Sequence, residues 1–118
     1  MATTAGNAAL AIGEVTRNAG VLFHVDAAQS AGKINIDMEQ MNVDLLSMSG
    51  HKIYGPKGTG FLYVRKGIRL EPLMHGGGHE HGIRSGTENV PAIIGFAKAA
   101  ELAHHDMKKE NSRLKSLR

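Results

Sequence analysis

The sequence contains no cysteine and no tryptophan, and its aromatic residues are three phenylalanines and two tyrosines. Without cysteine the chain itself cannot form a disulfide, a thiolate metal site or a cysteine nucleophile. No apolar run approaches the roughly 18 residues of a membrane span. The first residues also lack the basic start of a secretion signal. These absences predict a soluble, untargeted protein, and we expect a cytoplasmic location.

Charge is balanced and spread along the chain. Lysine and arginine number 14 and acidic residues 11, which leaves a net charge of +3. So mild a surplus, without a basic stripe, predicts neither a nucleic-acid partner nor a membrane partner. With 42% hydrophobic and 21% charged residues the 118-residue chain has the composition of a folded domain, and its length allows one domain at most.

The pattern of apolar residues predicts alternating helices and strands, and therefore an α/β fold. Helices are predicted over residues 7–19, with Asn7 as N-cap and Gly20 just past the end, over a short stretch at 37–41, and from Val90 onward. Strands are predicted over residues 21–25, 43–48 and 60–64, and the first of them, nearly all apolar, is expected to be covered on both faces. The second and third strands are expected to pair locally. The glycine-rich stretch 74–82 is expected to be irregular.

Three strands make a small sheet, and both ends of the chain resemble the middle of a domain. A sheet of this size leaves open edges and helix faces with nothing to cover them. We therefore expect residues 1–118 to be a piece of a larger α/β domain.

Two charged residues follow predicted strands, Asp26 directly after the first and Lys52 a few residues after the second. Ligands of open α/β sheets bind beyond the carboxyl ends of the strands, so parallel strands would bring both side chains to one crevice. Pyridoxal phosphate uses such a pair: a lysine amine forms a Schiff base with it, and a carboxylate keeps its ring nitrogen protonated. The alternative is structural, because an aspartate after a strand commonly forms a turn and a lysine is commonly solvated.

The residues beside Lys52 offer donors for a phosphate group. Ser49 and His51 flank Gly50, whose small size lets the backbone approach an anion. The glycines that follow have part of the spacing of a nucleotide-binding phosphate loop. However, Pro56 stands where that loop has its lysine, and a predicted strand follows in place of a helix. A nucleotide site is therefore rejected.

Four blocks in fixed order carry a resemblance to a known family: His24–Ser30, Ser47–Gly58, His75–Glu80 and Arg84–Thr87. With them the chain closely resembles the cysteine desulfurase family of class-V aminotransferases, from about Ile12 to its end. The resemblance implies a fold-type-I pyridoxal-phosphate-dependent transferase, with a mostly parallel sheet flanked by helices. Residues 1–118 would then be an incomplete fragment of the cofactor-binding large domain, and the small C-terminal domain would be absent.

The family resemblance also implies an activity and partners. Cysteine desulfurases convert L-cysteine into L-alanine and leave the sulfur as an enzyme-bound persulfide. That sulfur serves iron–sulfur cluster assembly or thio-modification, so sulfur-acceptor or scaffold proteins are expected partners. The family works as a homodimer, and its cofactor is pyridoxal 5'-phosphate.

Six positions of this chain match cofactor-binding positions of the family, and the lysine among them is also the catalytic residue. In the family the carboxylate partners the pyridine nitrogen and the amide bonds the ring's phenolic oxygen. The hydroxyl and the imidazole bind the phosphate, and the threonine reaches the phosphate of the other subunit. The matching residues are Asp26, Gln29, Ser49, His51, Lys52 and Thr87.

Other family positions have no counterpart in this chain. A stacking histidine and a phosphate-binding threonine would precede its first residue, and the asparagine-containing motif expected near Thr3–Leu10 is absent. The persulfide-forming cysteine and the arginine that binds the substrate carboxylate would follow Arg118. We therefore expect this chain to be inactive alone. The alternatives are a non-catalytic dimerisation or interaction fragment, or one half of a split enzyme.

Three of the remaining histidines lie close enough in sequence to suggest a metal site. His75, His79 and His81 fall within seven residues, but the three glycines between the first two forbid the helix that an i, i+4 metal pair needs. No metal site is predicted, and a glycine-rich loop near a subunit interface is favoured. His24 is expected to be a hydrogen-bonded core histidine. The last helix carries His104 and His105, which are expected to face solvent.

Overall fold

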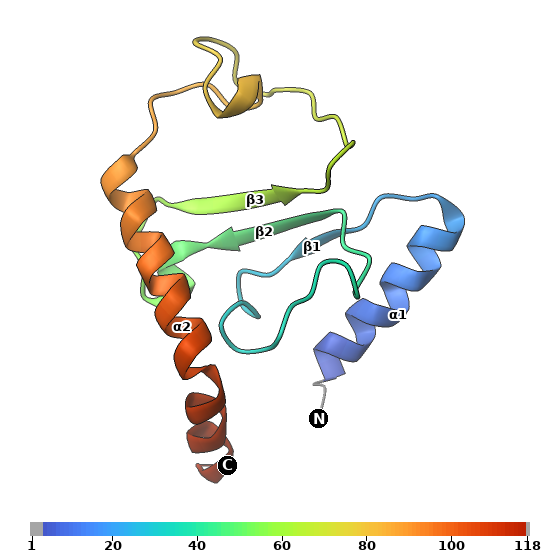
Figure 1. The fold of residues 1–118 in the computed structure, drawn as a ribbon, viewed down its shortest axis with the longest axis vertical. Helices are drawn as coiled ribbons and strands as arrows, with labels where there is room; N and C mark the ends of the chain where they lie inside the picture. The colour runs from blue at the N-terminus through green and yellow to red at the C-terminus, as the bar shows by residue number, and fades with distance from the viewer. Residues whose placement is uncertain (1–3, 118) are drawn as a thin grey trace.

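The structure is a computed structural model, and it describes residues 4–117. Two long helices, α1 (Thr4–Ala19) and α2 (Val90–Ser116), flank three strands in Figure 1: β1 (His24–Asp26), β2 (Leu45–Ser49) and β3 (Gly60–Val64). Two short 3₁₀ turns complete the described part, η1 (Gly50–Ile53) and η2 (Glu80–Gly82). The predicted α/β class is confirmed. None of the described helices is both long enough and apolar enough to cross a membrane.

The sheet has the strand order β1-β2-β3 and is mixed. β1 and β2 run parallel, with Asp26 opposite Ser47, whereas β2 and β3 form an antiparallel pair, with Ser49 opposite Gly60. The local pairing predicted for the second and third strands is therefore confirmed. The carboxyl ends of β1 and β2 point to the same side of the sheet, the side on which α2 lies (Figure 1).

Helix α1 ends as its sequence predicts but begins earlier. Gly20 has φ +67°, and the N–H groups of Gly20 and Val21 donate to the carbonyls of Arg17 and Thr16. These two bonds form a Schellman motif, which glycine permits because it has no Cβ. The predicted N-cap at Asn7 is wrong. The described helix already includes Thr4, Ala5 and Gly6, so Asn7 lies inside it.

The first strand is shorter and lies later than predicted. Residues Val21 and Leu22 are exposed and stand outside it, because the chain before His24 is held by an aspartate side chain in place of a ladder. Asp44 accepts the N–H of Phe23 on Oδ2 at 2.9 Å, and its own N–H donates to the Phe23 carbonyl at 2.9 Å. The ladder between β1 and β2 begins after these two hydrogen bonds, at the pair His24–Leu45.

The expected coverage of the first strand on both faces is wrong. The register places Val25, Leu46 and Tyr63 on one face of the sheet, where Leu46 is 1% exposed. The opposite face carries His24, Ser47 and Leu62, and there Leu62 is 46% exposed. The Cα atoms span only 17 Å along the thinnest direction, room for one sheet and a single helical layer. Because the helical layer covers one face of the sheet, His24 on the other face is exposed. Its predicted place in the core is therefore also wrong.

The short helix predicted at 37–41 is a series of turns. The Asp37 carboxylate accepts the N–H groups of Glu39 and Gln40 at 3.0 and 2.9 Å, as a helix N-cap does, but the segment closes after a single turn. Asn42 then takes a left-handed conformation with φ +52° and ends the segment.

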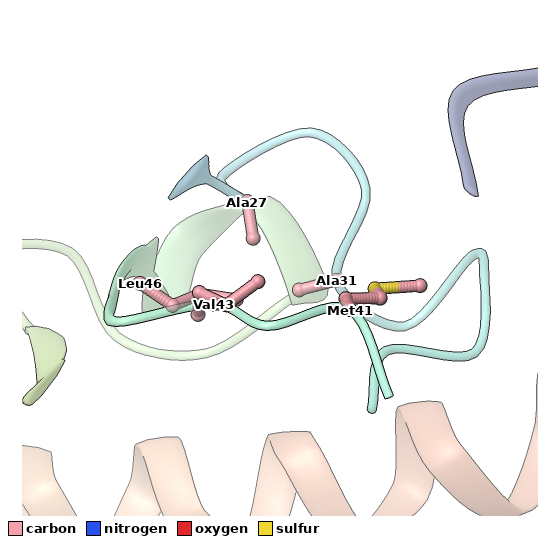
Figure 2. Close-up of a cluster of buried hydrophobic side chains, with 5 residues drawn as sticks. All are labelled: Ala27, Ala31, Met41, Val43 and Leu46. Carbon is pink, nitrogen blue, oxygen red and sulfur yellow. The ribbon is translucent and has the colours of Figure 1, made fainter. Parts of the chain in front are cut away.

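The buried core is a small cluster between the segment after β1 and the strand β2 (Figure 2). The segment after β1 contributes the small side chains of this cluster, and β2 with the residues just before it contributes the larger ones. The small side chains let the segment pack closely on the strand. The members are Ala27, Ala31, Met41, Val43 and Leu46. This cluster holds the segment that follows Asp26 against β2.

An arginine ties the opposite end of the sheet together. The Nη2 group of Arg65, just after β3, donates to the carbonyls of Met38 and Val43 at 3.1 and 3.0 Å. Its Nη1 lies 2.9 Å from Glu39 Oε1, and its Nε lies 3.1 Å from Asp44 Oδ1. The Nε–H is not aligned with a hydrogen-bond acceptor among residues 4–117, so the contact with Asp44 is Coulombic. Because Asp44 also holds Phe23, this arginine clasp links all three strands.

Candidate cofactor site

Five of the six predicted site residues lie at the carboxyl ends of β1 and β2. Asp26 is the last residue of β1, and Gln29 follows three residues later. Ser49 is the last residue of β2, and η1 then carries His51 and Lys52. Because β1 and β2 are parallel neighbours, the two groups stand at the same edge of the sheet, as an α/β ligand site requires.

The turn that carries Lys52 is closed by its own backbone. The Gly50 N–H donates to the Thr59 carbonyl at 2.9 Å, and the Gly50 carbonyl accepts the N–H groups of Tyr54 and Gly55. Gly50 and Ile53 are buried, whereas Lys52 is exposed. The Lys52 amine has no hydrogen-bond or ion-pair partner within residues 4–117, so it is available to a ligand.

Asp26 has one carboxylate oxygen engaged and one available. Its Oδ1 accepts the Ala28 N–H at 2.9 Å, which is the turn-forming role that the sequence left open as an alternative. Among the described residues Oδ2 has no partner, so the turn does not prevent ligand binding. Gln29 accepts from the Lys33 amine on Oε1 at 3.4 Å, and its amide NH₂ stays free to donate.

Asp26 and Gln29 line a cavity of about 500 Å³ whose walls are mostly apolar, formed in part by Val25, Ile36 and Met41. Lys52 is not among the residues that line it. The structure therefore brings Asp26 and Gln29 together in one cavity and places Lys52 on the neighbouring turn. The shared crevice predicted for Asp26 and Lys52 is supported by the strand order and not by a common cavity.

Thr87 lies apart from the other five residues. It is exposed and belongs to the connection between η2 and α2, which passes on the far side of β3 from β1 (Figure 1). Its predicted role toward a second subunit stays a prediction.

The histidine-rich loop is irregular apart from η2, in agreement with its glycine content. His79 Nδ1 accepts the Gly86 N–H at 3.3 Å, and an isolated bridge joins Met74 to Arg84. Within residues 4–117 no three His, Cys, Asp or Glu side chains are arranged to hold a metal ion. On α2, His104 and His105 are exposed as predicted, and His105 contacts Asp106 at 2.9 Å.

Sequence reasoning missed two residues that shape the site. Tyr54 follows the Lys52 turn with φ +66° and a side chain that is 100% exposed. A non-glycine residue with left-handed backbone angles is strained. The sequence signal for Tyr54 was its position two residues after Lys52. Phe96 of α2 packs on the turn itself, a contact across more than forty residues that no local pattern signals.

These features define a class of protein: an α/β chain with a free lysine and a carboxylate at adjacent parallel strand ends. Residues 5–118 match the family model described as aminotransferase class V. Since the match covers nearly the whole chain, the protein belongs to the class-V aminotransferase family. The family resemblance stated from the four sequence blocks is confirmed.

Curated proteins similar to this chain include cysteine desulfurases. The cysteine desulfurase IscS of Shewanella denitrificans is 57% identical over 111 residues, and that of Shewanella amazonensis is 58% identical over 110. Both alignments cover 92% of this chain but only 28% and 27% of the relatives. The chain therefore spans little more than a quarter of the length of these proteins.

Solved structures give the same result for the fold. The NifS-like protein of Rickettsia africae has a TM-score of 0.83 and 37% identity, over 86% of this chain and 28% of that one. The structure "SspA in complex with cysteine" has a TM-score of 0.76 and 52% identity, over 79% of this chain and 27% of that one. The matched segment thus has the fold of part of a cysteine desulfurase.

The donors at the strand ends suit pyridoxal phosphate. Lys52 offers an unpartnered amine for the aldehyde, and Asp26 offers a free carboxylate oxygen for the ring nitrogen. Ser49 and His51 offer a hydroxyl and an imidazole for the phosphate. The residues present therefore fit the cofactor that the family implies.

Proposed function

We propose that residues 1–118 form part of the pyridoxal-phosphate-binding large domain of a cysteine desulfurase, with Lys52 as the residue that holds the cofactor. The observation that carries the proposal is the unpartnered Lys52 amine on η1, one strand away from Asp26. Family membership supports it, and so do relatives that are cysteine desulfurases.

When bound, pyridoxal phosphate supplies an electron sink next to the α-carbon of an amino-acid substrate. Asp26 Oδ2 would hold a proton on the ring nitrogen, and the Gln29 amide would donate to the phenolic oxygen. Ser49 and His51 would bind the phosphate. The Lys52 amine would move a proton at the substrate α-carbon.

The sulfur half of the reaction needs a thiol from outside these residues, because the 118-residue sequence has no cysteine. In the complete protein we propose the family reaction, from L-cysteine to L-alanine and an enzyme-bound persulfide. Its sulfur would go to iron–sulfur clusters or thio-modification, and the protein would act as a homodimer. The chain by itself is expected to form no more alanine from L-cysteine than free cofactor does.

Covalent attachment of the cofactor tests the proposal. Purified chain mixed with pyridoxal phosphate should gain a visible absorption band, and borohydride should fix the label mainly on Lys52, as read by peptide mass spectrometry. Lys52→Ala should lose both signals. Lys57→Ala is the matched control, because Lys57 is an exposed lysine on the same connection and should leave both signals intact.

Two results would contradict the proposal. One is the absence of a band with wild-type chain, and the other is a label spread evenly over the exposed lysines. Lys52-dependent formation of alanine by the chain alone would refute the separate expectation that the sulfur step needs outside residues.

A further inference from the structure

Helix α2 packs against the turn that carries Lys52. A Cβ placed on Gly50 would lie 3.2 Å from Phe96 Cδ2 and 3.3 Å from Phe96 Cγ. Phe96 is 7% exposed and is the buried residue of α2. Its ring also packs on Phe61 of β3, with centroids 5.9 Å apart. The phenylalanine therefore sits between the sheet and the start of the Lys52 turn.

The end of the turn rests on the same side of α2. A Cβ on Gly55 would lie 3.3 Å from the Ala99 Cβ and 2.9 Å from the Gly50 carbonyl oxygen. A Cβ on Gly95 would lie 2.8 Å from Pro56 Cγ. Residues 95, 96 and 99 of α2 thus contact both ends of the segment 50–56. The helix and the segment lie so close together that a methyl group at Gly50, Gly55 or Gly95 would crowd the contact.

Lys52 lies in the middle of this braced segment. Gly50 and Ile53 are buried, while Lys52 stays exposed on the same short turn. The Gly50 carbonyl closes the turn by accepting the N–H groups of Tyr54 and Gly55. Any shift of Gly50 against the Phe96 ring therefore moves the backbone from which the lysine extends. Tyr54 at φ +66° shows that the closed shape persists despite backbone strain.

We infer that Phe96 is a positioning residue for Lys52: through its contact with Gly50 it fixes the turn so that the amine meets the cofactor in one geometry. The inference rests on the proposed function, since it needs Lys52 to bind pyridoxal phosphate. The contact through which Phe96 would act is its approach to the backbone of Gly50. Small displacements at a reacting atom carry large rate penalties, which is how a packing contact can govern attachment.

Three variants test the contact. Gly50→Ala adds a methyl 3.2 Å from Phe96 Cδ2 and 3.3 Å from the Pro56 carbonyl oxygen. Phe96→Ala removes the ring, including the Cδ2 and Cγ atoms that the methyl would meet, and the double variant therefore returns space to the added methyl. Each single change should slow attachment of pyridoxal phosphate to Lys52 by about tenfold, and the double variant should regain much of the loss. Attachment joins the Lys52 nitrogen to the aldehyde carbon with release of water, and borohydride then fixes the bond.

Two readouts separate positioning from general destabilisation. The first is the share of label on Lys52 relative to Lys57, and the second is the pH midpoint of the visible band. Both should change in the single variants while the far-ultraviolet circular dichroism stays unchanged. Ile94→Ala is the matched control on α2, because Ile94 is 64% exposed and should leave both readouts unchanged. If Phe96→Ala fails to fold, Gly50→Ala keeps the test decisive.

The outcomes distinguish this inference from the function on which it rests. Without preferential labelling of Lys52 in the wild-type chain, both are wrong. If the wild-type chain prefers Lys52 and folded Gly50→Ala keeps the same preference and the same pH midpoint, only the positioning role is overturned. Single variants that lose the preference, with recovery in the double variant, support it.

Discussion

Arg65→Met tests whether the arginine clasp holds the strands in register. The guanidinium donates to two backbone carbonyls, at 3.1 and 3.0 Å, and lies 3.1 Å from the Asp44 carboxylate. Its side chain is 23% exposed, so these contacts are largely shielded from water. A hydrogen bond from a charged donor contributes about 1.5–3 kcal/mol, and part of this returns when water reaches the carbonyls.

The ion pair with Glu39 adds little, because that carboxylate is 76% exposed and exposed pairs contribute about 0–1 kcal/mol. We therefore expect Arg65→Met to lower the free energy of unfolding by about 2–4 kcal/mol, mainly through the two carbonyl bonds and Asp44. The hydrogen bond that Arg65 donates to Glu39 raises the pKa of Arg65, and attraction to Glu39 and Asp44 adds to this. The Arg65 guanidinium is therefore charged at neutral pH.

The assay is urea unfolding followed by far-ultraviolet circular dichroism. Lys98→Met is the matched control, because it removes an exposed cation that contacts Glu101 on α2 at 2.9 Å. That change should cost about 0.5 kcal/mol or less. Arg65→Lys should fall between the two, since it keeps the charge but loses the planar fork that reaches two carbonyls. Equal costs for Arg65→Met and Lys98→Met would refute the reasoning.

Two further predictions concern the core and the pH dependence of α2. Leu46→Ala should destabilise the chain by about 2–3 kcal/mol, near the low end for buried leucines because Leu46 also borders the open cavity. Leu46→Met should cost less than about 1.5 kcal/mol in the same urea assay, and equal costs would contradict this packing argument. The hydrogen bond from Arg113 lowers the pKa of Glu110 below its ordinary 4.5, so the stability that this pair adds is complete above pH 4.5. That stability is lost as the pH falls through the lowered pKa. Carboxyl NMR titration should show a midpoint below 4.5 that rises in Arg113→Gln, and an unchanged midpoint would count against the pair.

The sequence predicted best the elements whose signals are local. The strand at 60–64 and the helix from Val90 begin where predicted, because glycine before an apolar run and a helix-forming composition act over a few residues. The boundaries of β1 were misplaced because the Phe23–Asp44 clasp joins residues 21 positions apart. Which face of the sheet the helices cover depends on tertiary packing and has no local signal.

The sequence also predicted part of the candidate site. Asp26 and Lys52 were identified because ligand sites lie at parallel strand ends, and the parallel pairing of β1 and β2 is confirmed. The separation of Lys52 from the cavity of Asp26 and Gln29 follows from side-chain packing and was not predictable. The support of the Lys52 turn by Phe96 spans 46 positions of sequence and had no signature either.

Helix α2 also reaches the other side of the site, where the Asn111 side chain donates to the Lys33 carbonyl at 2.8 Å, across 78 residues of sequence. Contacts within the sheet join residues far closer in the chain, and such contacts close at a smaller entropic cost. During synthesis on the ribosome the strands can therefore pair while α2 is still being made. Both the Lys52 turn and the loop after Asp26 gain their helical support only when α2 emerges, so the binding edge is completed after the strands have paired.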